Sequence, residues 1–202
     1  MADKTPPDPA TGQPDALLSS GTEALSIRAV MAVPGGGRCI LAGFPGLSSG
    51  VDGSSYMDPE ILSATLDWCR AAGASRCLAL PEAKELPEGA LPLLAAGLER
   101  CGIALSHHPI RDYCAPDEGF MQHWASLGPR LHALLDSGGT CVLTCLYGAG
   151  RSGLVAALLL IERGMAPDAA IAHVRAAFSE AVESKVQMRW LQALSPGRPA
   201  AP

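Results

Sequence analysis

Short apolar stretches alternate with longer amphipathic stretches along most of the chain. Short runs of aliphatic and β-branched residues, bounded by Gly, Pro or polar residues, are typical of buried strands. They predict strands at 26–33, 38–43, 76–80, 103–105 and 140–144. Strands that alternate with helices favour a mostly parallel sheet that is covered on both faces. The pattern therefore predicts an α/β fold with a mostly parallel central sheet flanked by helices.

The amphipathic stretches carry start and stop signals of helices. Asp58 and Pro59 combine a capping carboxylate with a proline at the first helical position, and Gly73 suits a helix end. The predicted helices are 58–73, 91–101, 120–135, 152–164, 167–178 and a last one from 184. We expect the loop 48–56 to be mobile and the polar connection 82–88 to be a solvated surface loop.

The two ends of the chain differ in composition from its middle. Residues 1–24 are rich in Pro, Asp, Thr, Ser and Gly, which predicts a disordered tail. A second, short disordered tail is expected at 196–202. Residues 25–195 form one predicted domain, because a chain that is 48% hydrophobic can bury a sizeable core.

Charge and cysteine pattern exclude several classes of function. The net charge is −5 and the basic residues are dispersed, so no nucleic-acid surface is expected. The longest apolar run, Leu154 to Ile161, is far shorter than the roughly 20 residues of a membrane span. The N-terminus lacks an apolar signal core, and the seven cysteines lack the spacing of zinc ligands. We therefore expect a cytoplasmic monomer with reduced thiols, no metal, and no membrane or nucleic-acid partner.

Candidate chemistry gathers in the stretch Thr140 to Gly164, which reads as a strand, a glycine-containing loop and an apolar helix. A loop that enters a helix N-terminus points backbone N–H groups at one position, and the helix dipole adds positive charge. Arg151 can add two parallel hydrogen bonds to an oxyanion. The same field favours the thiolate of Cys145, which is the nucleophilic form. The stretch therefore predicts a phosphate site with an attacking sulfur at its base.

Four motifs in this order resemble a known family. They are LAGFPG at 41–46, HHPIRDYCAPD at 107–117, TCLYGAGRSGLVAALLL at 144–160 and AVESKVQ at 181–187. The chain resembles the cysteine-dependent protein tyrosine and dual-specificity phosphatases, and more specifically the kinase-associated phosphatase (cyclin-dependent kinase inhibitor 3) family. The resemblance implies the protein tyrosine phosphatase-like fold, with 25–195 as the phosphatase domain and no cofactor.

The resemblance also implies a role for each matching residue. Cys145 would attack phosphorus, Arg151 would hold the phosphoryl oxygens, Asp112 would protonate the leaving oxygen, and Ser152 would help to expel the thiolate. Asp117 is the alternative acid. The phosphate-binding loop would comprise Leu146, Tyr147, Gly148, Ala149, Gly150 and Arg151.

Three further residues are candidates for supporting roles. Thr144 stands where the family has a histidine that orders the loop, and its hydroxyl can donate a hydrogen bond. Gln187, and less clearly Glu183, match late family positions where a side-chain amide could place the hydrolytic water. His108 precedes the acid loop and could orient it, although a structural role is the alternative. Tyr147 stands where the family usually has Gly or Ala.

The function implied by the resemblance is hydrolysis of phosphotyrosine through a cysteinyl-phosphate intermediate. Phosphoserine and phosphothreonine would be additional substrates. The partner would be a phosphorylated protein. One alternative is a catalytically weak or inactive pseudophosphatase that only binds phosphate, and another is a phosphatase acting on a non-protein phosphate. A rhodanese-like sulfur-transfer domain also uses a cysteine loop, but it gives no role to Asp112.

Overall fold

The computed structural model describes residues 25–200. The predicted tail at 1–24 and the last residues of the predicted tail at 196–202 lie outside this range. The strands are β1 (Ile27–Ala32), β2 (Arg38–Ala42), β3 (Leu47–Ser49), β4 (Ser55–Met57), β5 (Ala74–Ala79), β6 (Ala104–His107) and β7 (Thr140–Thr144). The helices are α1 (Pro59–Ala71), α2 (Ala90–Arg100), α3 (Glu118–Asp136), α4 (Gly150–Glu162), α5 (Pro167–Ala177) and α6 (Lys185–Gln192), with a short 3-10 helix, η3 (Ala83–Glu85).

Five strands form the central sheet in the order β1-β2-β7-β5-β6. β1 pairs with β2 antiparallel, and the pairs β2–β7, β7–β5 and β5–β6 are parallel. Thr144, at the end of β7, pairs with Ala42 of β2 and with Ala79 of β5. The prediction of a mostly parallel sheet is therefore confirmed, and β7 lies at its centre with the carboxyl ends of its neighbours beside its own.

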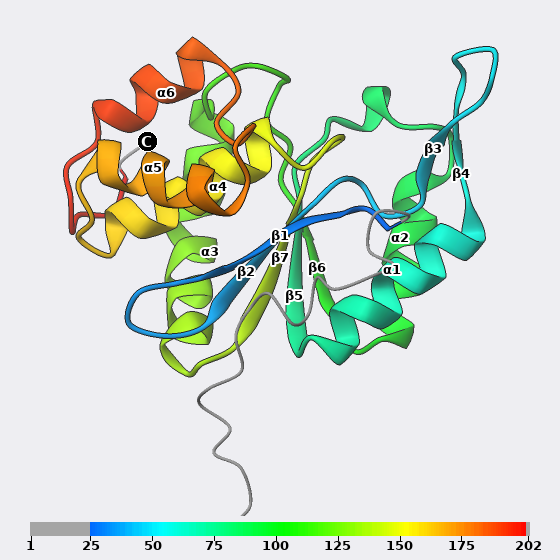
Figure 1. The fold of residues 1–202 in the computed structure, drawn as a ribbon, viewed down its shortest axis with the longest axis horizontal. Helices are drawn as coiled ribbons and strands as arrows, with labels where there is room; N and C mark the ends of the chain where they lie inside the picture. The colour runs from blue at the N-terminus through cyan, green and yellow to red at the C-terminus, as the bar shows by residue number, and fades with distance from the viewer. Residues whose placement is uncertain (1–24, 201–202) are drawn as a thin grey trace, which may run out of the picture.

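Helices cover both faces of the sheet (Figure 1). α3, α4, α5 and α6 lie on one face, and α1 and α2 lie on the other. Successive side chains of β7 alternate between the two cores, because a strand directs neighbouring residues to opposite faces. Cys141 and Leu143 join the core under α3 and α4, and Val142 joins the core under α1 and α2. Burial on both faces explains why the middle of β7, residues 141–143, is apolar.

One stretch differs from the expected elements. The loop expected to be mobile at 48–56 contains most of a hairpin, because β3 and β4 pair antiparallel from Leu47 and Met57 to Ser49 and Ser55. Polar residues close its turn, where Ser54 N and Oγ both donate to Asp52 Oδ1. The apolar alternation that signals a strand is weak in this serine-rich segment, so the pattern did not reveal it. Elsewhere, α3 continues through Pro129 to Asp136.

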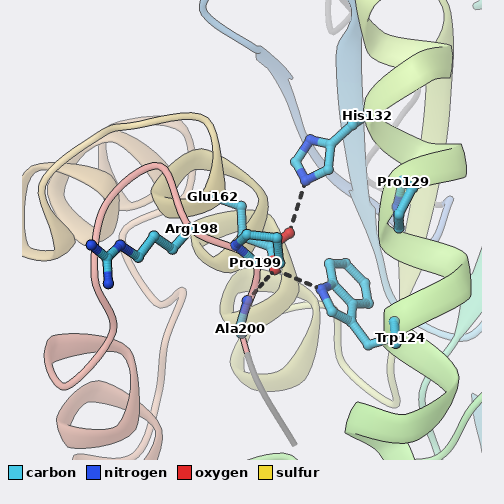
Figure 2. Close-up of a pocket in the computed structure, with 8 residues that line it drawn as sticks. Trp124, Pro129, His132, Glu162, Arg198, Pro199 and Ala200 are labelled. Atoms are coloured by element: carbon cyan, nitrogen blue, oxygen red, sulfur yellow. Dashed lines mark hydrogen bonds and ion pairs between the residues drawn. The ribbon is translucent and has the colours of Figure 1, made fainter.

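Glu162, at the end of α4, holds the C-terminal segment against α3 (Figure 2). Its Oε1 accepts from Trp124 Nε1 at 2.9 Å and from Ala200 N at 2.8 Å, and its Oε2 accepts from His132 Nε2 at 2.8 Å. The carboxylate side chain is only 6% exposed. Residues up to Ala200 are thus placed against the domain, beyond the expected boundary at 195. No helix of residues 25–200 is long and apolar enough to cross a membrane.

We expect Glu162→Leu to lower the free energy of unfolding by about 2–4 kcal/mol. Two N–H donors, those of Trp124 and Ala200, would lose their acceptor, and each unsatisfied buried donor costs about 1–3 kcal/mol. Glu162→Gln should cost less, because an amide oxygen can still accept both bonds and His132 can change tautomer. Urea unfolding measures both variants. Equal losses for Leu and Gln would contradict the hydrogen-bonding explanation.

Candidate active site

The candidate site is the loop between β7 and α4, at the carboxyl edge of the sheet. Cys145 follows the last residue of β7, and its N–H donates to Ala42 O of the neighbouring strand at 3.3 Å. The loop then turns sharply at Gly148, where φ is +98°. A Cβ at this position would lie 2.5 Å from the backbone carbon of Ala42, so only glycine fits. The close approach to β2 is what lets the loop curl over Cys145.

The Cys145 sulfur lies inside this curl and is almost fully buried, with 3% of the residue exposed. Gly148 N donates to Cys145 Sγ at 3.2 Å. α4 begins at Gly150, so the first turn of a helix of 13 residues faces the same region. Backbone donors and the helix dipole both stabilise negative charge at such a position. The arrangement suits a thiolate and an adjacent oxyanion.

Arg151 lies in the first turn of α4 and only 1% of it is exposed. Its Nη1 donates to Glu85 Oε2 at 2.7 Å and to Ile110 O at 3.1 Å. Its Nη2 forms an ion pair with Asp112 Oδ1 at 3.2 Å. These contacts hold the guanidinium against the segments that follow β5 and β6.

The guanidinium of Arg151 keeps its charge in this buried position. Burial by itself disfavours the charged form, but the hydrogen bond to Glu85 and the negative charges of Cys145, Glu85 and Asp112 outweigh it. The pKa of Arg151 is therefore raised above its ordinary value. A permanent cation beside the Cys145 sulfur favours both the thiolate and a bound dianion.

Two buried polar atoms of the site have no hydrogen-bond partner within residues 25–200. They are Arg151 Nε and Ser152 Oγ, on consecutive residues of α4. Buried polar groups are normally paired, so an unpaired donor at a candidate site indicates room for a ligand group. A phosphoryl oxygen suits the guanidinium N–H, and a thiolate or phosphoryl oxygen suits the hydroxyl.

Asp112 lies on the loop that joins β6 to α3, and its side chain is 43% exposed. Its carboxylate faces Arg151 and lines the pocket over Cys145. Asp117, the alternative acid, instead caps α3 by accepting from Phe120 N at 2.8 Å. The structure thus brings Asp112, and not Asp117, to the cysteine loop.

The acid loop is attached to the segment between α5 and α6. Ser184 Oγ donates to Tyr113 O at 2.7 Å. Tyr113 has a φ of +56°, as does Val182, and a β-branched residue rarely adopts this conformation. Arg175 fixes the second segment by donating to the carbonyls of Ala181 and Val182 at 3.0 and 2.9 Å. Both loops are therefore held in place beside the pocket.

The predicted supporting residues have different surroundings. Thr144 is fully buried and donates to Gly43 O at 2.8 Å, which ties the end of β7 to the segment after β2. Gln187 is buried in the first turn of α6, and its amide nitrogen lies 3.4 Å from the position of a Cβ on Gly150. The ring of His108 packs against that of His123, tilted by 34° with 4.7 Å between centroids, and His108 does not line the pocket over Cys145. Burial, then the charges of its histidine neighbours, lower the pKa of His108.

A pocket of about 310 Å³ opens over the cysteine loop. Two half-exposed aromatic rings, Tyr113 and Tyr147, stand among its lining residues. Arg28 orients Tyr147, because its guanidinium lies 4.6 Å from the ring centroid and its Nε donates to Tyr147 O at 2.8 Å. The pocket lining is Asp112, Tyr113, Cys145, Leu146, Tyr147, Gly150, Arg151, Glu180 and Glu183.

Glu85 is the main site residue that the sequence pattern did not reveal. The prediction of a solvated loop at 82–88 is wrong for Glu85, whose side chain is 14% exposed and paired with Arg151. η3 holds it there, since Glu85 Oε2 also accepts from Glu82 N at 2.6 Å. The Glu-x-x-Glu spacing of Glu82 and Glu85 is typical of a capping box and indicates a structured turn. Nothing local in the sequence indicates that this turn meets Arg151.

We expect Glu85→Gln to lower kcat/KM for an aryl phosphate by about ten- to a hundredfold. Glu85 would act only through Arg151, and small displacements of a positioning cation cost about this much. Affinity for phosphate, measured by isothermal titration calorimetry, should fall in parallel. Glu82→Gln is the matched control, since Glu82 pairs with exposed Lys84 and not with Arg151. Equal effects of the two variants would contradict the role of Glu85.

Comparison with known proteins agrees with this geometry. The sequence model of the cyclin-dependent kinase inhibitor 3 (CDKN3) family matches residues 65–171, more than half of the chain. The chain belongs to this family. The matched range includes Asp112, Cys145 and Arg151, and it ends before Glu180 and Glu183.

Curated relatives match over part of their length. Protein tyrosine phosphatase type IVA 3 of Bos taurus is 34% identical over 102 residues, which are 50% of this chain and 57% of that protein. The Homo sapiens protein of the same name is 33% identical over 100 residues, 49% of this chain and 56% of its own. The chain therefore spans little more than half the length of the curated relatives it matches.

Solved structures share the fold. A kinase-associated phosphatase with serine in place of its catalytic cysteine matches with a TM-score of 0.68 and 23% identity, over 83% of this chain and 92% of its own. A protein tyrosine phosphatase from Leishmania major, described as putative, matches with a TM-score of 0.62 and 18% identity, over 85% and 99%. The fold is that of the protein tyrosine and dual-specificity phosphatases.

Proposed function

We propose that this protein is a cysteine-dependent phosphatase whose main substrate is phosphotyrosine in phosphorylated proteins. Phosphoserine and phosphothreonine would be additional substrates. One observation carries the proposal: Cys145 of the loop before α4, Arg151 of the first turn of α4 and Asp112 of the loop after β6 converge around one pocket. Membership of the CDKN3 family and the tyrosine phosphatases among the relatives support it. A thiolate nucleophile has to stay reduced, which supports a location in the reducing cytoplasm.

In the first step, Cys145 Sγ attacks phosphorus and the bond from phosphorus to the ester oxygen breaks. Arg151 and the backbone N–H groups of residues 146–151 hold the non-bridging oxygens. Stabilisation of charge by donors already in place is the largest contribution in such sites. Asp112, as the carboxylic acid, gives its proton to the leaving oxygen. The products are a cysteinyl-phosphate and an alcohol or phenol.

In the second step, water attacks the cysteinyl-phosphate and the sulfur–phosphorus bond breaks. Asp112, now the carboxylate, accepts a proton from the water. The hydroxyl of Ser152 donates a hydrogen bond to the departing thiolate, which accounts for an Oγ without a partner within residues 25–200. Gln187, which is buried behind Gly150, would orient the water through its amide. Phosphate is released and Cys145 is again a thiolate.

Aromatic residues in the pocket favour phosphotyrosine over smaller phosphorylated side chains. The rings of Tyr113 and Tyr147 are 55% and 51% exposed at the pocket and can contact a phenyl ring on the bound ester. Aromatic pairs gain about 0.5–1.5 kcal/mol beyond the area they bury. Phosphoserine offers no such contact, so the gain is specific to an aryl ester.

A second candidate function is phosphate binding without turnover. It is favoured by Thr144, which stands where the related phosphatases carry a histidine and which donates to Gly43 O. The hydroxyl holds the loop but brings no positive charge to Cys145. On this alternative the protein would recognise a phosphorylated partner and leave it intact.

Steady-state hydrolysis of p-nitrophenyl phosphate by the purified full chain, in the presence of a chelator, tests the proposal. Turnover by wild type that is independent of added metal is the expected result. A protein that binds vanadate or phosphate but shows no turnover would support the binding function instead. Parallel assays with phosphotyrosine and phosphoserine peptides of one sequence measure the preference for aryl esters.

A further inference from the structure

Carboxylates surround the mouth of the pocket over Cys145. Asp112, Glu180 and Glu183 all line it, and they come from two segments far apart in the sequence. We call these three residues the acidic rim. Arg151 is the only basic residue among the pocket-lining residues of the described chain, and it is buried at the base. Charge is thus separated along the pocket, with the cation deep and the carboxylates outside.

Glu180 and Glu183 are not neutralised by the protein. Both are exposed, and within residues 25–200 neither forms an ion pair. The nearby Arg28 contacts Tyr147, and Arg175 is bound to backbone carbonyls. Glu180 and Glu183, unlike the third rim residue Asp112, therefore present unpaired negative charge to whatever enters the pocket.

The position of Glu183 is constrained by its surroundings. A Cβ on Gly150 would lie 2.9 Å from Glu183 Oε2, so the carboxylate covers the first residue of α4. Tyr113 meets the same carboxylate: the charge of Glu183 and a hydrogen bond to it raise the pKa of the phenol. The negative charge of Glu183 therefore lies at the mouth, beside Gly150 and Tyr113.

A ligand for this pocket has to satisfy two opposite charges. Arg151 Nε is buried, lacks a partner within residues 25–200, and belongs to a residue that lines the pocket, so the base requires an anion. The rim favours positive charge at the mouth of the pocket, since like charges repel and opposite charges attract. A phosphoryl group with Lys or Arg beside it meets both requirements. A molecule that carries several phosphates does not.

We propose that the acidic rim selects phosphorylated peptides that carry Lys or Arg next to the phosphorylated residue, and that it rejects polyanionic phosphate esters. The proposal rests on the proposed phosphatase function and names its substrate class. Each exposed ion pair changes affinity by a factor of about 1.5 to 5. Two such pairs give an expected preference of about two- to twenty-fivefold in kcat/KM.

The test compares one phosphotyrosine peptide in three forms, with Arg, Gln or Glu at both flanking positions. The expected order of kcat/KM for wild type is Arg, then Gln, then Glu, with a ratio that shrinks as salt approaches about 1 M. Glu180→Gln should reduce the Arg-to-Glu ratio, and Glu180→Lys should reduce it further. Glu99→Gln, an equal change of charge at an exposed position on α2, should leave the ratio unchanged.

The outcomes separate failure of the rim from failure of catalysis. Equal kcat/KM for the three peptides, with p-nitrophenyl phosphate still hydrolysed, would refute the proposed selectivity of the acidic rim. The phosphatase function would be unaffected by this result. Faster hydrolysis of a soluble inositol bisphosphate than of the Arg peptide would also refute the selectivity. If nothing is hydrolysed, fluorescence anisotropy of the labelled peptides with Cys145→Ser still measures the ratio. Equal affinities there would refute the rim independently of turnover.

Discussion

Cys145→Ser is expected to abolish hydrolysis of p-nitrophenyl phosphate, with a fall in kcat of roughly 10⁴-fold or more. The donors around Cys145, Gly148 N at 3.2 Å and the N-terminus of α4, stabilise a thiolate. The same field cannot ionise a serine hydroxyl near neutral pH, so the nucleophile is lost. Arg151 and the loop N–H groups remain, so binding of phosphate or vanadate should persist. A colorimetric assay of p-nitrophenol release measures hydrolysis, and isothermal titration calorimetry measures the binding of phosphate or vanadate separately.

Cys101→Ser is the matched control for this substitution. Cys101 is half-buried at the end of α2, on the opposite face of the sheet from α4. Its replacement should leave kcat within about twofold, because it touches neither the loop nor Arg151. Turnover by Cys145→Ser at the wild-type rate would refute the cysteinyl-phosphate mechanism. Loss of oxyanion binding in that variant would instead show that the loop had changed shape.

Asp112→Ala is expected to lower kcat by about 10²–10⁴-fold on substrates with poor leaving groups. A phenoxide or alkoxide of high basicity requires a proton as it leaves, and Asp112 lines the pocket beside Arg151. A leaving group such as p-nitrophenoxide requires little protonation, so the fall in kcat should be much smaller for p-nitrophenyl phosphate. A series of aryl phosphates with different phenol acidities measures this dependence.

Asp117→Ala tests the assignment of the acid. Asp117 caps α3 through Phe120 N, and its loss should cost about 1 kcal/mol of stability without any dependence on leaving group. A loss that is equal across the aryl series for Asp112→Ala would remove Asp112 as the acid. A leaving-group dependence confined to Asp117→Ala would move the role to that residue.

The parts of the fold that the sequence could predict are those set by local chemistry. α1 begins after Asp58, whose side chain accepts from Glu60 N and Ile61 N, as its capping pattern indicates. The cysteine loop lies between β7 and α4 because strand, loop and helix are consecutive in the chain. Hydrophobic periodicity, helix caps and glycine turns depend on only a few neighbouring residues, so they can be predicted from the local sequence. The hairpin of β3 and β4 escaped because its short strands lack that periodicity.

In the candidate site, too, some features follow from the local sequence and others from the tertiary structure. The sequence by itself determined that Cys145 and Arg151 share one loop and helix start, since one short segment carries both. Only the tertiary structure decided that Glu85, 66 residues away, would pair with Arg151 and that Glu180 and Glu183 would rim the pocket. Those contacts depend on the strand order, which places β7 between β2 and β5 and brings the ends of distant segments together. Strand order follows from how whole faces pack, and no local pattern encodes it.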